Sequence, residues 1–332
     1  MIAVRKLRKS YGVTRPAPAL RGVSFDLPAR GVTGLLGPNG AGKSTTIRIL
    51  TGFIRPDDGS VTLAGIDALA DPQTARFRLG YLPESAPLYP ELTAERYLRY
   101  RAGLFGLRGR RARDAAAAAA DRCRLGPLRA RRIGALSKGY RQRVGLAAAI
   151  LHDPPVVILD EPASGLDPAQ IRETRSMIRE LGESRTVLVS SHLLSEVEAG
   201  CDRALVLTQG RLVADGSPRE LISEHATGPA ALLVEASGPG EPTWAVTLRG
   251  IARVVSEPRG NRRWSIRLEP SSTEQAAGSP LADRAARAVH DAGWSLHAVT
   301  PESPTLEEVF IGLLRNAEPK SERGAGPVGG DA

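Results

Sequence analysis

The sequence predicts an α/β fold with a largely parallel central sheet, and two observations support this. The runs "VVILD" (156–160) and "TVLVSS" (186–191) are continuously apolar and alternate with helical patterns. Strands of a parallel sheet that helices cover on both faces have this composition. The glycine-rich loop "GPNGAGKSTT" (37–46) follows the strand-like run "TGLL" and precedes a helical pattern. This order of strand, loop and helix is typical of a phosphate-binding unit.

The N-terminal residues 1–36 predict a small antiparallel layer that leads into the first buried strand. The runs "GVSFDL" and "GVTGLLG" flank a turn at 28–31, and "SVTLAG" (60–65) alternates again between apolar and polar residues. After the glycine-rich loop, "KSTTIRILTG" has helical spacing, and Gly52 is the expected C-terminal cap of that helix.

The middle of the chain predicts a helical region and then a hairpin. Residues 91–134 have a helical pattern rich in arginine and alanine, and the six alanines at 115–120 act as strong helix formers. The stretch "RALVLTQGRLVADG" (203–216) predicts a hairpin that turns at Gln209 and Gly210.

The C-terminal region predicts a second, smaller α/β domain. Short strands are expected at "AALLVEA", "WAVTLRG", "RRWSIRLE" and "WSLHAVT", with an amphipathic helix at about 280–292. A last helix covers 303–315; either Ser303 caps it, followed by Pro304, or Thr305 caps it and Glu308 reaches back. We therefore expect domains at 1–222 and 230–316, a linker at 223–229, and a disordered tail at 317–332.

Composition limits the environment in which the protein can work. The net charge of +9 comes almost entirely from arginine and suits nucleic acid, an anionic membrane surface, or merely a solvated surface. Cys123 and Cys201 are isolated, which favours a reducing compartment. The N-terminus has no apolar run of the secretory type, and the longest apolar run, Val144 to Leu151, is shorter than the ~18 residues of a membrane span. Any role at a membrane would need a partner.

The glycine-rich loop carries the first chemical motif. Gly37, Gly42, Lys43 and Ser44 fit the pattern G-x-x-x-x-G-K-[ST]. In this pattern backbone N–H groups and the positive end of the following helix surround the β-phosphate. We expect Lys43 to bridge the β- and γ-phosphates and the Ser44 hydroxyl to hold Mg²⁺.

Two adjacent carboxylates follow a buried strand and carry the second motif. Asp160 ends the strand "VVILD", where α/β sheets present their ligands, so it is the expected Mg²⁺ carboxylate. Glu161 is the expected general base for an attacking water. A helix N-cap would explain one of these acids but not both. His192, after the next apolar strand, would reach the γ-phosphate side if the two strands are neighbours.

A second helix start suited to an anion lies in "LSKGYRQR", residues Leu136 to Arg143. Ser137 is the expected N-cap, and Gly139 leaves backbone donors of the first turn open. Lys43 and Ser137 are 94 positions apart (137 − 43), so one nucleotide cannot easily occupy both helix starts within one chain. The economical solution is two chains arranged head to tail, each completing the other's site.

The order of these motifs resembles the ABC-type ATPase family. The six motifs are Gly37–Thr45, "GYLPE" (80–84), Leu136–Gln142, "VVILDEP" (156–162), "SGLD" (164–167) and "SSH" (190–192). The segments "GYLPESAPLYPELT", "LSKGYRQRVGLA" and "PTLEEVF" are most similar to ATPase subunits of ABC-2 exporters, including the gliding-motility type. The resemblance implies a P-loop ATPase fold over residues 1–222, with a mixed sheet core, an antiparallel β subdomain and a helical subdomain.

The resemblance also implies a role for each matching residue. Tyr11 would stack on adenine, Asp160 would serve Mg²⁺, Glu161 would activate water, and His192 would sense the γ-phosphate. Ser137 and Gly139 would contact ATP held by the partner chain, and Asp167 would link the two sites. The phosphates would be held by the loop residues Gly37, Pro38, Asn39, Gly40, Ala41, Gly42, Lys43, Ser44 and Thr45.

This sequence departs from the family pattern in two places. Lys138 and Tyr140 replace a glycine and a glutamine of the usual Leu-Ser-Gly-Gly-Gln, and Lys138 adds a charge that favours phosphate. Glu84 stands where a glutamine is usual. An ionised Glu84 can approach Mg²⁺ but cannot donate a hydrogen bond, so its coupling role differs from that of the amide.

Partners and location are also implied by the resemblance. We expect a separate integral-membrane permease, a second ATPase chain, identical or not, and a position on the cytoplasmic face of the membrane through the permease. The segment 85–101 would form either the groove for a permease loop or part of the helical core, through Leu88, Leu92, Tyr97 and Leu98. An ABC ATPase acting on nucleic acid or ribosomes is the alternative, although no nucleic acid is expected. A non-catalytic module would lack one of the lysine, the two acids or the histidine.

Overall fold

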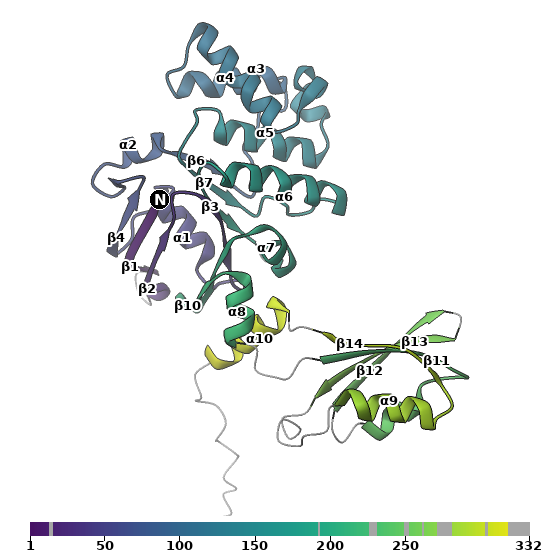
Figure 1. Cartoon of the computed structure of the whole chain (residues 1–332). Coiled ribbons are helices and arrows are strands. Elements are labelled where there is room, and N and C mark those ends of the chain that lie inside the picture. Colours follow the sequence, from purple (N-terminus) through teal and green to yellow (C-terminus); the bar gives the residue numbers. More distant parts are fainter. Residues whose placement is uncertain are drawn as a thin grey trace, which may run out of the picture. The chain divides into compact units, whose positions relative to one another are not determined.

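The computed structural model describes residues 1–12, 16–191, 193–225, 231–248, 252–260, 262–270, 281–302 and 305–317. The chain divides into two compact units, Met1–Glu220 together with the residues from Asn316 onward, and Leu221–Arg315 (Figure 1). His192, most of the expected linker at 223–229 and nearly all of the expected tail at 317–332 lie outside the described residues.

The first unit contains two sheets. Four antiparallel strands make one sheet in the order β2-β1-β4-β5. The other has six strands in the order β10-β9-β3-β8-β7-β6, all parallel except for β10, which pairs antiparallel with β9. The strands are β1 (Ile2–Tyr11), β2 (Ala17–Leu27), β3 (Gly31–Leu36), β4 (Asp58–Leu63), β5 (Ile66–Asp67), β6 (Leu79–Leu82), β7 (Val156–Asp160), β8 (Thr186–Ser190), β9 (Arg203–Thr208) and β10 (Arg211–Gly216).

A common apolar core joins the two sheets through helix α1 (Lys43–Leu50). Val4 of β1, Ile47 of α1 and Leu188 of β8 are fully buried in one cluster. The apolar alternation of the N-terminal strands points one face of the antiparallel sheet into this cluster, as period-2 patterning requires. The glycine-rich loop is therefore anchored between two sheets rather than at a free edge.

Helices cover the other face of the six-stranded sheet. α3 (Ala94–Leu104), α4 (Gly109–Arg122) and α5 (Lys138–Ile150) form a layer, which Figure 1 shows at the top of this unit, with β6 and β7 between it and α1. The alanine tract lies in α4, where Ala116, Ala119 and Ala120 are buried, because small side chains let helices approach closely. The remaining helices of this unit are α2 (Pro72–Phe77), α6 (Pro168–Gly182) and α7 (Leu194–Gly200).

The second unit is a four-stranded antiparallel sheet in the order β12-β13-β11-β14. Its buried cluster includes Val234, Ile266 and Val289, so α9 covers one sheet face. Helix α8 begins at Pro218, at the end of the first unit, and includes residues 223–225 of the expected linker. The other elements are β11 (Ala231–Ser237), β12 (Ala252–Gly260), β13 (Arg263–Pro270), α9 (Leu281–Asp291), β14 (Ser295–Glu302) and α10 (Leu306–Ala317).

The prediction of one strand in this unit is wrong. The run "WAVTLRG" predicts a strand, but Thr243–Leu248 is a 3₁₀ helix, and the next strand, β12, begins only at Ala252. Trp244 is buried and meets Trp294 edge to face at 6.3 Å, so ring packing overrides the strand propensity of this segment.

The structure decides between the two N-caps that the sequence allows for the last helix, α10. Thr305 N donates to Glu308 Oε2 at 3.1 Å, and Glu308 N donates to Thr305 Oγ1 at 3.3 Å. This reciprocal pair is a capping box, with Thr305 as the N-cap. Ser303 and Pro304, the other alternative, lie outside the described residues.

Candidate functional site

The glycine-rich loop turns from β3 into α1, and its backbone requires glycine. Gly42 precedes α1 with φ 108°, and a Cβ there would lie 2.7 Å from Leu20 Cδ2 and 2.8 Å from Ala19 O. At Gly37 a Cβ would lie 2.4 Å from Leu207 O. The first turn of α1 receives no side-chain cap, so its N–H groups remain available to an anion.

The loop is held in place by the turn of the β9–β10 hairpin. Gly210 N donates to Ala41 O at 3.0 Å, and Arg21 N donates to Gly210 O at 2.8 Å. Gln209 and Gly210 both have positive φ, as a two-residue hairpin turn needs. The sequence predicts this turn, but its contact with the phosphate loop comes only from the tertiary structure.

Lys43 is a buried cation that faces the acidic pair Asp160 and Glu161. Its side-chain ammonium donates to Gly37 O at 2.5 Å and to Pro38 O at 3.3 Å. Burial lowers the pKa of Lys43, and the carboxylates of Glu161 and Asp160 oppose that shift. The lysine from the loop and the acids from β7 therefore act on one another across the same edge of the sheet.

The acidic pair ends β7, where neighbouring strands β8 and β6 also end. Ser190 of β8 is opposite Asp160, and its hydroxyl donates to Asp160 Oδ1 at 2.6 Å. The same hydroxyl accepts from Glu161 N at 2.9 Å. Glu161 has φ 48°, in the left-handed region, which few non-glycine residues adopt. Neither acid is a helix N-cap, because α6 begins only at Pro168.

Ser190 is the site residue that the sequence analysis missed. It lies in the quoted motif "SSH", directly before Ser191. The run 186–191 is mainly apolar, which is typical of a buried strand. Nothing in this run predicts which of its hydroxyls reaches the neighbouring strand. The strand order, which places β8 between β3 and β7, supplies that information.

Two expected site residues lie near this edge from other elements. Glu84 is exposed two residues beyond Leu82, which pairs with Leu159, the residue before Asp160. Tyr11 is 42% exposed, and its hydroxyl lies 3.4 Å from Thr45 Oγ1 at the start of α1. Tyr11 therefore lies beside the loop with much of its side chain exposed. His192 lies outside the described residues, although β8, which leads to it, is the neighbour of β7.

Ser137 caps the second helix start, as the sequence predicts. This helix packs on other elements than the helix that begins at Lys43. Ser137 is the N-cap of α5 and accepts from Tyr140 N at 3.4 Å. A Cβ at Gly139 would meet Gln170 of α6. α5 packs on α3, α4 and β6, whereas α1 packs on β2 and β7 (Figure 1). The two helix starts thus belong to different parts of the unit.

The loop "SGLD" lies beside the start of α5. A Cβ at Gly165 would meet the Lys138 ammonium, so this lysine lies over the loop in the same chain. Asp167 is the N-cap of α6, and its Oδ1 accepts from Ala169 N at 3.0 Å and Gln170 N at 2.9 Å. Asp167 therefore orders the end of the loop.

A cleft of about 360 Å³ opens between the sheet and the helical layer. It is lined mainly by aromatic, apolar and arginine side chains, among them Phe53, Tyr81, Leu88, Tyr97, Arg101 and His152. Tyr97 and Leu98 are also buried in the helical core, and Leu88 and Leu92 pack against it. The segment 85–101 thus contributes to both the core and the cleft wall. We call this opening the docking cleft.

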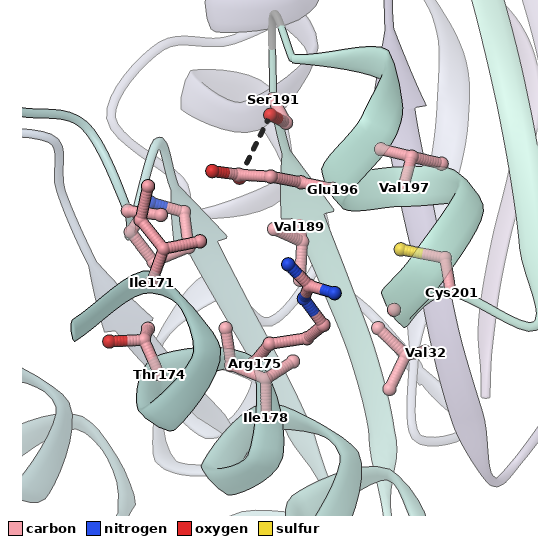
Figure 2. Close-up of a pocket in the computed structure, with 13 residues that line it drawn as sticks. Val32, Ile171, Thr174, Arg175, Ile178, Val189, Ser191, Glu196, Val197 and Cys201 are labelled. Carbon is pink, nitrogen blue, oxygen red and sulfur yellow. Dashed lines mark hydrogen bonds between the residues drawn. The ribbon is translucent and has the colours of Figure 1, made fainter. Parts of the chain in front are cut away.

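A smaller cavity lies behind the acidic pair, between α6 and α7. Figure 2 shows the Arg175 side chain reaching in among Val32, Val189 and Cys201, with Ser191 bonded to Glu196 at 3.3 Å. Its volume of about 30 Å³ leaves room for no more than a few water molecules.

The described residues hold no cluster of three histidine, cysteine, aspartate or glutamate side chains fit to bind a metal. Mg²⁺ that arrives with a nucleotide needs only one or two carboxylates, because phosphate and water supply the other ligands. Within the described ranges, none of the helices combines the length and apolar character of a membrane span.

Comparisons with known proteins agree with this geometry. The family model described as "ABC transporter" matches residues 20–164. A linearmycin resistance ATP-binding protein of Bacillus subtilis is 31% identical over 94% of this chain and 98% of its own length. A daunorubicin resistance ATP-binding protein of Streptomyces coeruleorubidus is 33% identical over 97% of both chains.

Solved structures of similar fold give the same result. An ATP-binding subunit of an ABC transporter superposes with a TM-score of 0.60 at 31% identity, covering 68% of this chain and 93% of that one. A dimeric bacterial ABC transporter cassette superposes with a TM-score of 0.59 at 26% identity, covering 65% and 98%. The α/β fold that the sequence predicts is confirmed.

Proposed function

The chain belongs to the ABC transporter family as an ATP-binding subunit, and from this we propose that it powers export through a permease that is a separate chain. It is an ATPase, and hydrolysis of ATP to ADP and phosphate supplies the energy. Relatives named for antibiotic resistance and for Nod factor export support the exporter type over an ATPase that acts on nucleic acid or ribosomes.

One observation carries the enzymatic part of this proposal. The buried Lys43 ammonium and the acidic pair share one sheet edge, beside an uncapped helix start. A triphosphate fits this arrangement, because the helix start and Lys43 offer positive charge to its oxygens. In this proposal the carboxylate of Glu161 would lie on the side from which water attacks the terminal phosphate. We assign the phosphate contacts to Gly37–Thr45 and the adenine contact to Tyr11.

The residues at this edge also fit Mg²⁺. Asp160 Oδ1 accepts a hydrogen bond from Ser190, which leaves the second carboxylate oxygen for the metal. Ser44 offers an exposed hydroxyl at the start of α1. Glu84 follows the end of β6 by two residues, and we propose that it serves as a further oxygen ligand. When bound, Mg²⁺ would neutralise charge on the phosphate oxygens.

The chain's own residues perform the remaining steps. Glu161 accepts a proton from the attacking water, and Lys43 stabilises the charge that builds up on the phosphate oxygens. His192 would sense the terminal phosphate from the end of β8. Loss of that phosphate removes contacts of Lys43 and His192, which is how hydrolysis would change the conformation.

We propose that two chains pair head to tail around two nucleotides. Support comes from the separation of the two helix starts within unit 1: α5, which begins next to Ser137, packs on α3, α4 and β6, whereas α1 packs on β2 and β7. In the pair, Ser137 and Gly139 would bind the partner's ATP, and Asp167 would connect the two sites. The partner chain is a second copy or a paralogue.

The docking cleft is the proposed seat of a permease loop. Its arginines and exposed aromatic rim, including Phe53 at 70% exposure, fit a helical loop with apolar and acidic side chains. This partner would hold the protein on the cytoplasmic face of the membrane. We propose residues 1–222 as the ATPase domain and 230–316 as an accessory domain that supports pairing or regulation.

Two measurements test the proposal together. The purified chain should release phosphate from ATP in the presence of Mg²⁺, and an integral membrane protein should co-purify with it from membranes. Release without any membrane partner, combined with a salt-sensitive shift of nucleic acid in a gel, would instead favour the soluble alternative.

A further inference from the structure

Ser190 is the last residue of β8, the strand between β3 and β7 in the six-stranded sheet. It pairs with Leu35, shortly before the phosphate loop, and with Asp160 on the other side. Its side chain is fully buried, with 0% exposure. Ser190 therefore lies between the two strands that deliver the lysine and the acids.

The Ser190 hydroxyl makes two bonds that face the acidic pair. It donates to Asp160 Oδ1 at 2.6 Å and accepts from Glu161 N at 2.9 Å. The first is a short hydrogen bond to a carboxylate oxygen, the stronger kind. One buried hydroxyl thus fixes a side chain and the backbone of the next residue at the same time.

The backbone of Glu161 needs such support. Its φ of 48° is in the left-handed region, which costs a non-glycine residue on the order of 1 kcal/mol or more. Residues keep such a conformation only where their surroundings enforce it. The bond from Glu161 N to Ser190 is one of the contacts that enforces it here.

We propose that Ser190 is a positioning residue for ATP hydrolysis, resting on the proposed function above. Its hydroxyl leaves one oxygen of Asp160 directed to the metal side and holds the Glu161 backbone so that the Glu161 carboxylate addresses the attacking water. Ser190 itself touches neither nucleotide nor water. The hydroxyl therefore affects turnover and the Mg²⁺ dependence of nucleotide binding, and not the nucleotide affinity measured without Mg²⁺.

Substitution of Ser190 separates these effects. In Ser190→Ala, Asp160 loses its fixed rotamer and Glu161 N loses its acceptor. We expect turnover to fall, and the Mg²⁺ concentration for half-maximal nucleotide binding to rise, each by roughly 10- to 100-fold, the usual effect of removing a residue that orients a metal ligand. Nucleotide binding measured in EDTA should be unchanged. A fluorescent ATP analogue reports the binding, and phosphate release reports the turnover.

Two further variants show whether the hydroxyl is responsible. Ser190→Thr keeps the hydroxyl on a side chain that suits a strand, so it should restore most of the turnover and the Mg²⁺ response. Ser190→Cys keeps the volume with a weak donor and should resemble Ser190→Ala. The melting temperature of each variant distinguishes loss of positioning from loss of folding.

The adjacent Ser191 provides a matched control. It is also buried, but its hydroxyl bonds to Leu193 N and Glu196 and not to the acidic pair. Ser191→Ala should leave the Mg²⁺ response of nucleotide binding unchanged. An equal change of that response in Ser190→Ala and Ser191→Ala would overturn the proposal, as would a wild-type response in Ser190→Ala.

Failure of the proposed function itself would look different. If the wild-type chain releases no phosphate and binds no nucleotide, the ATPase assignment fails before Ser190 is tested. If the wild-type chain hydrolyses ATP normally and Ser190→Ala matches it in turnover and Mg²⁺ response, only the role of Ser190 is rejected.

Discussion

Lys43 and Glu161 lie on the same edge of the sheet, and the different roles that we propose for them can be separated by single substitutions. Lys43 is 9% exposed and surrounded by backbone carbonyls, so it acts through charge that burial strengthens. Glu161 lies in a left-handed backbone conformation at the strand end, where its carboxylate can receive a proton. Binding and turnover should therefore respond separately at these two residues.

Glu161→Gln should keep ATP binding and slow turnover by roughly 10²–10⁴-fold, because glutamine retains the shape but cannot accept the proton. Phosphate release and nucleotide titration measure the two effects. Glu180→Gln is the control, since Glu180 is an exposed residue of α6 paired with Arg124. Normal turnover in Glu161→Gln would remove Glu161 from the role of general base.

Lys43→Ala should weaken ATP binding by at least about tenfold, because a hydrogen bond to a charged group contributes about 1.5–3 kcal/mol. Isothermal titration calorimetry measures this directly. Lys9→Ala removes a lysine of β1 that pairs with Asp57, and should bind ATP as the wild type does. An unchanged affinity in Lys43→Ala would contradict the phosphate-loop assignment.

At the scale of elements, the helical layer is joined to the sheet partly through His152, which follows α5. Its ring stacks on Phe105 of the α3 end at 3.6 Å between centroids, and its Nε2 lies 3.2 Å from Leu79 O. Burial lowers the pKa of His152 to about 4, with the carbonyl of Leu79 opposing that shift. The neutral imidazole is thus the form that this junction accommodates.

Acid should weaken this junction. The unfolded chain has a His152 pKa near 6.5, so between about pH 6.5 and pH 4 it binds more protons than the folded chain. The contribution of His152 to the free energy of unfolding therefore falls as pH decreases through that window and is constant above it. Urea unfolding from pH 7 to pH 5 should show a smaller decrease in His152→Gln. Equal decreases in both proteins would contradict this cause.

At the scale of the whole molecule, the two helix starts decide how many chains make one site. The start of α1 faces the acidic pair, whereas the start of α5 lies against α6 in a different part of the unit. In the pairing that we propose, a complete site with both helix starts needs a second chain. A solved ABC transporter cassette of similar fold is also a dimer.

Glu161→Gln should form a dimer when loaded with ATP and Mg²⁺, because the uncleaved triphosphate holds both halves together. Light scattering after size exclusion reports the mass. Adding Ser137→Ala should weaken that dimer, whereas Ser176→Ala, which changes a half-buried serine of α6 bonded to Glu180, should not. A chain that stays monomeric with ATP bound would contradict the shared site.

The sequence by itself determined the parallel α/β core, the phosphate loop and the acidic pair. These features are local: a glycine pattern, an apolar run and the residues at its end fix them without reference to distant contacts. The same local signals misplaced a strand at Thr243–Leu248, because ring packing between Trp244 and Trp294 is a long-range contact.

Only the tertiary structure decided what supports the site. Gly210 holds the loop through Ala41, and Ser190 holds the acids, because a hairpin and a strand distant in sequence lie beside them in the sheet. Strand order is set by burial summed over the whole chain, so no short stretch encodes it. The residues that we propose to meet phosphate could therefore be picked out from the sequence, whereas those that orient them could not.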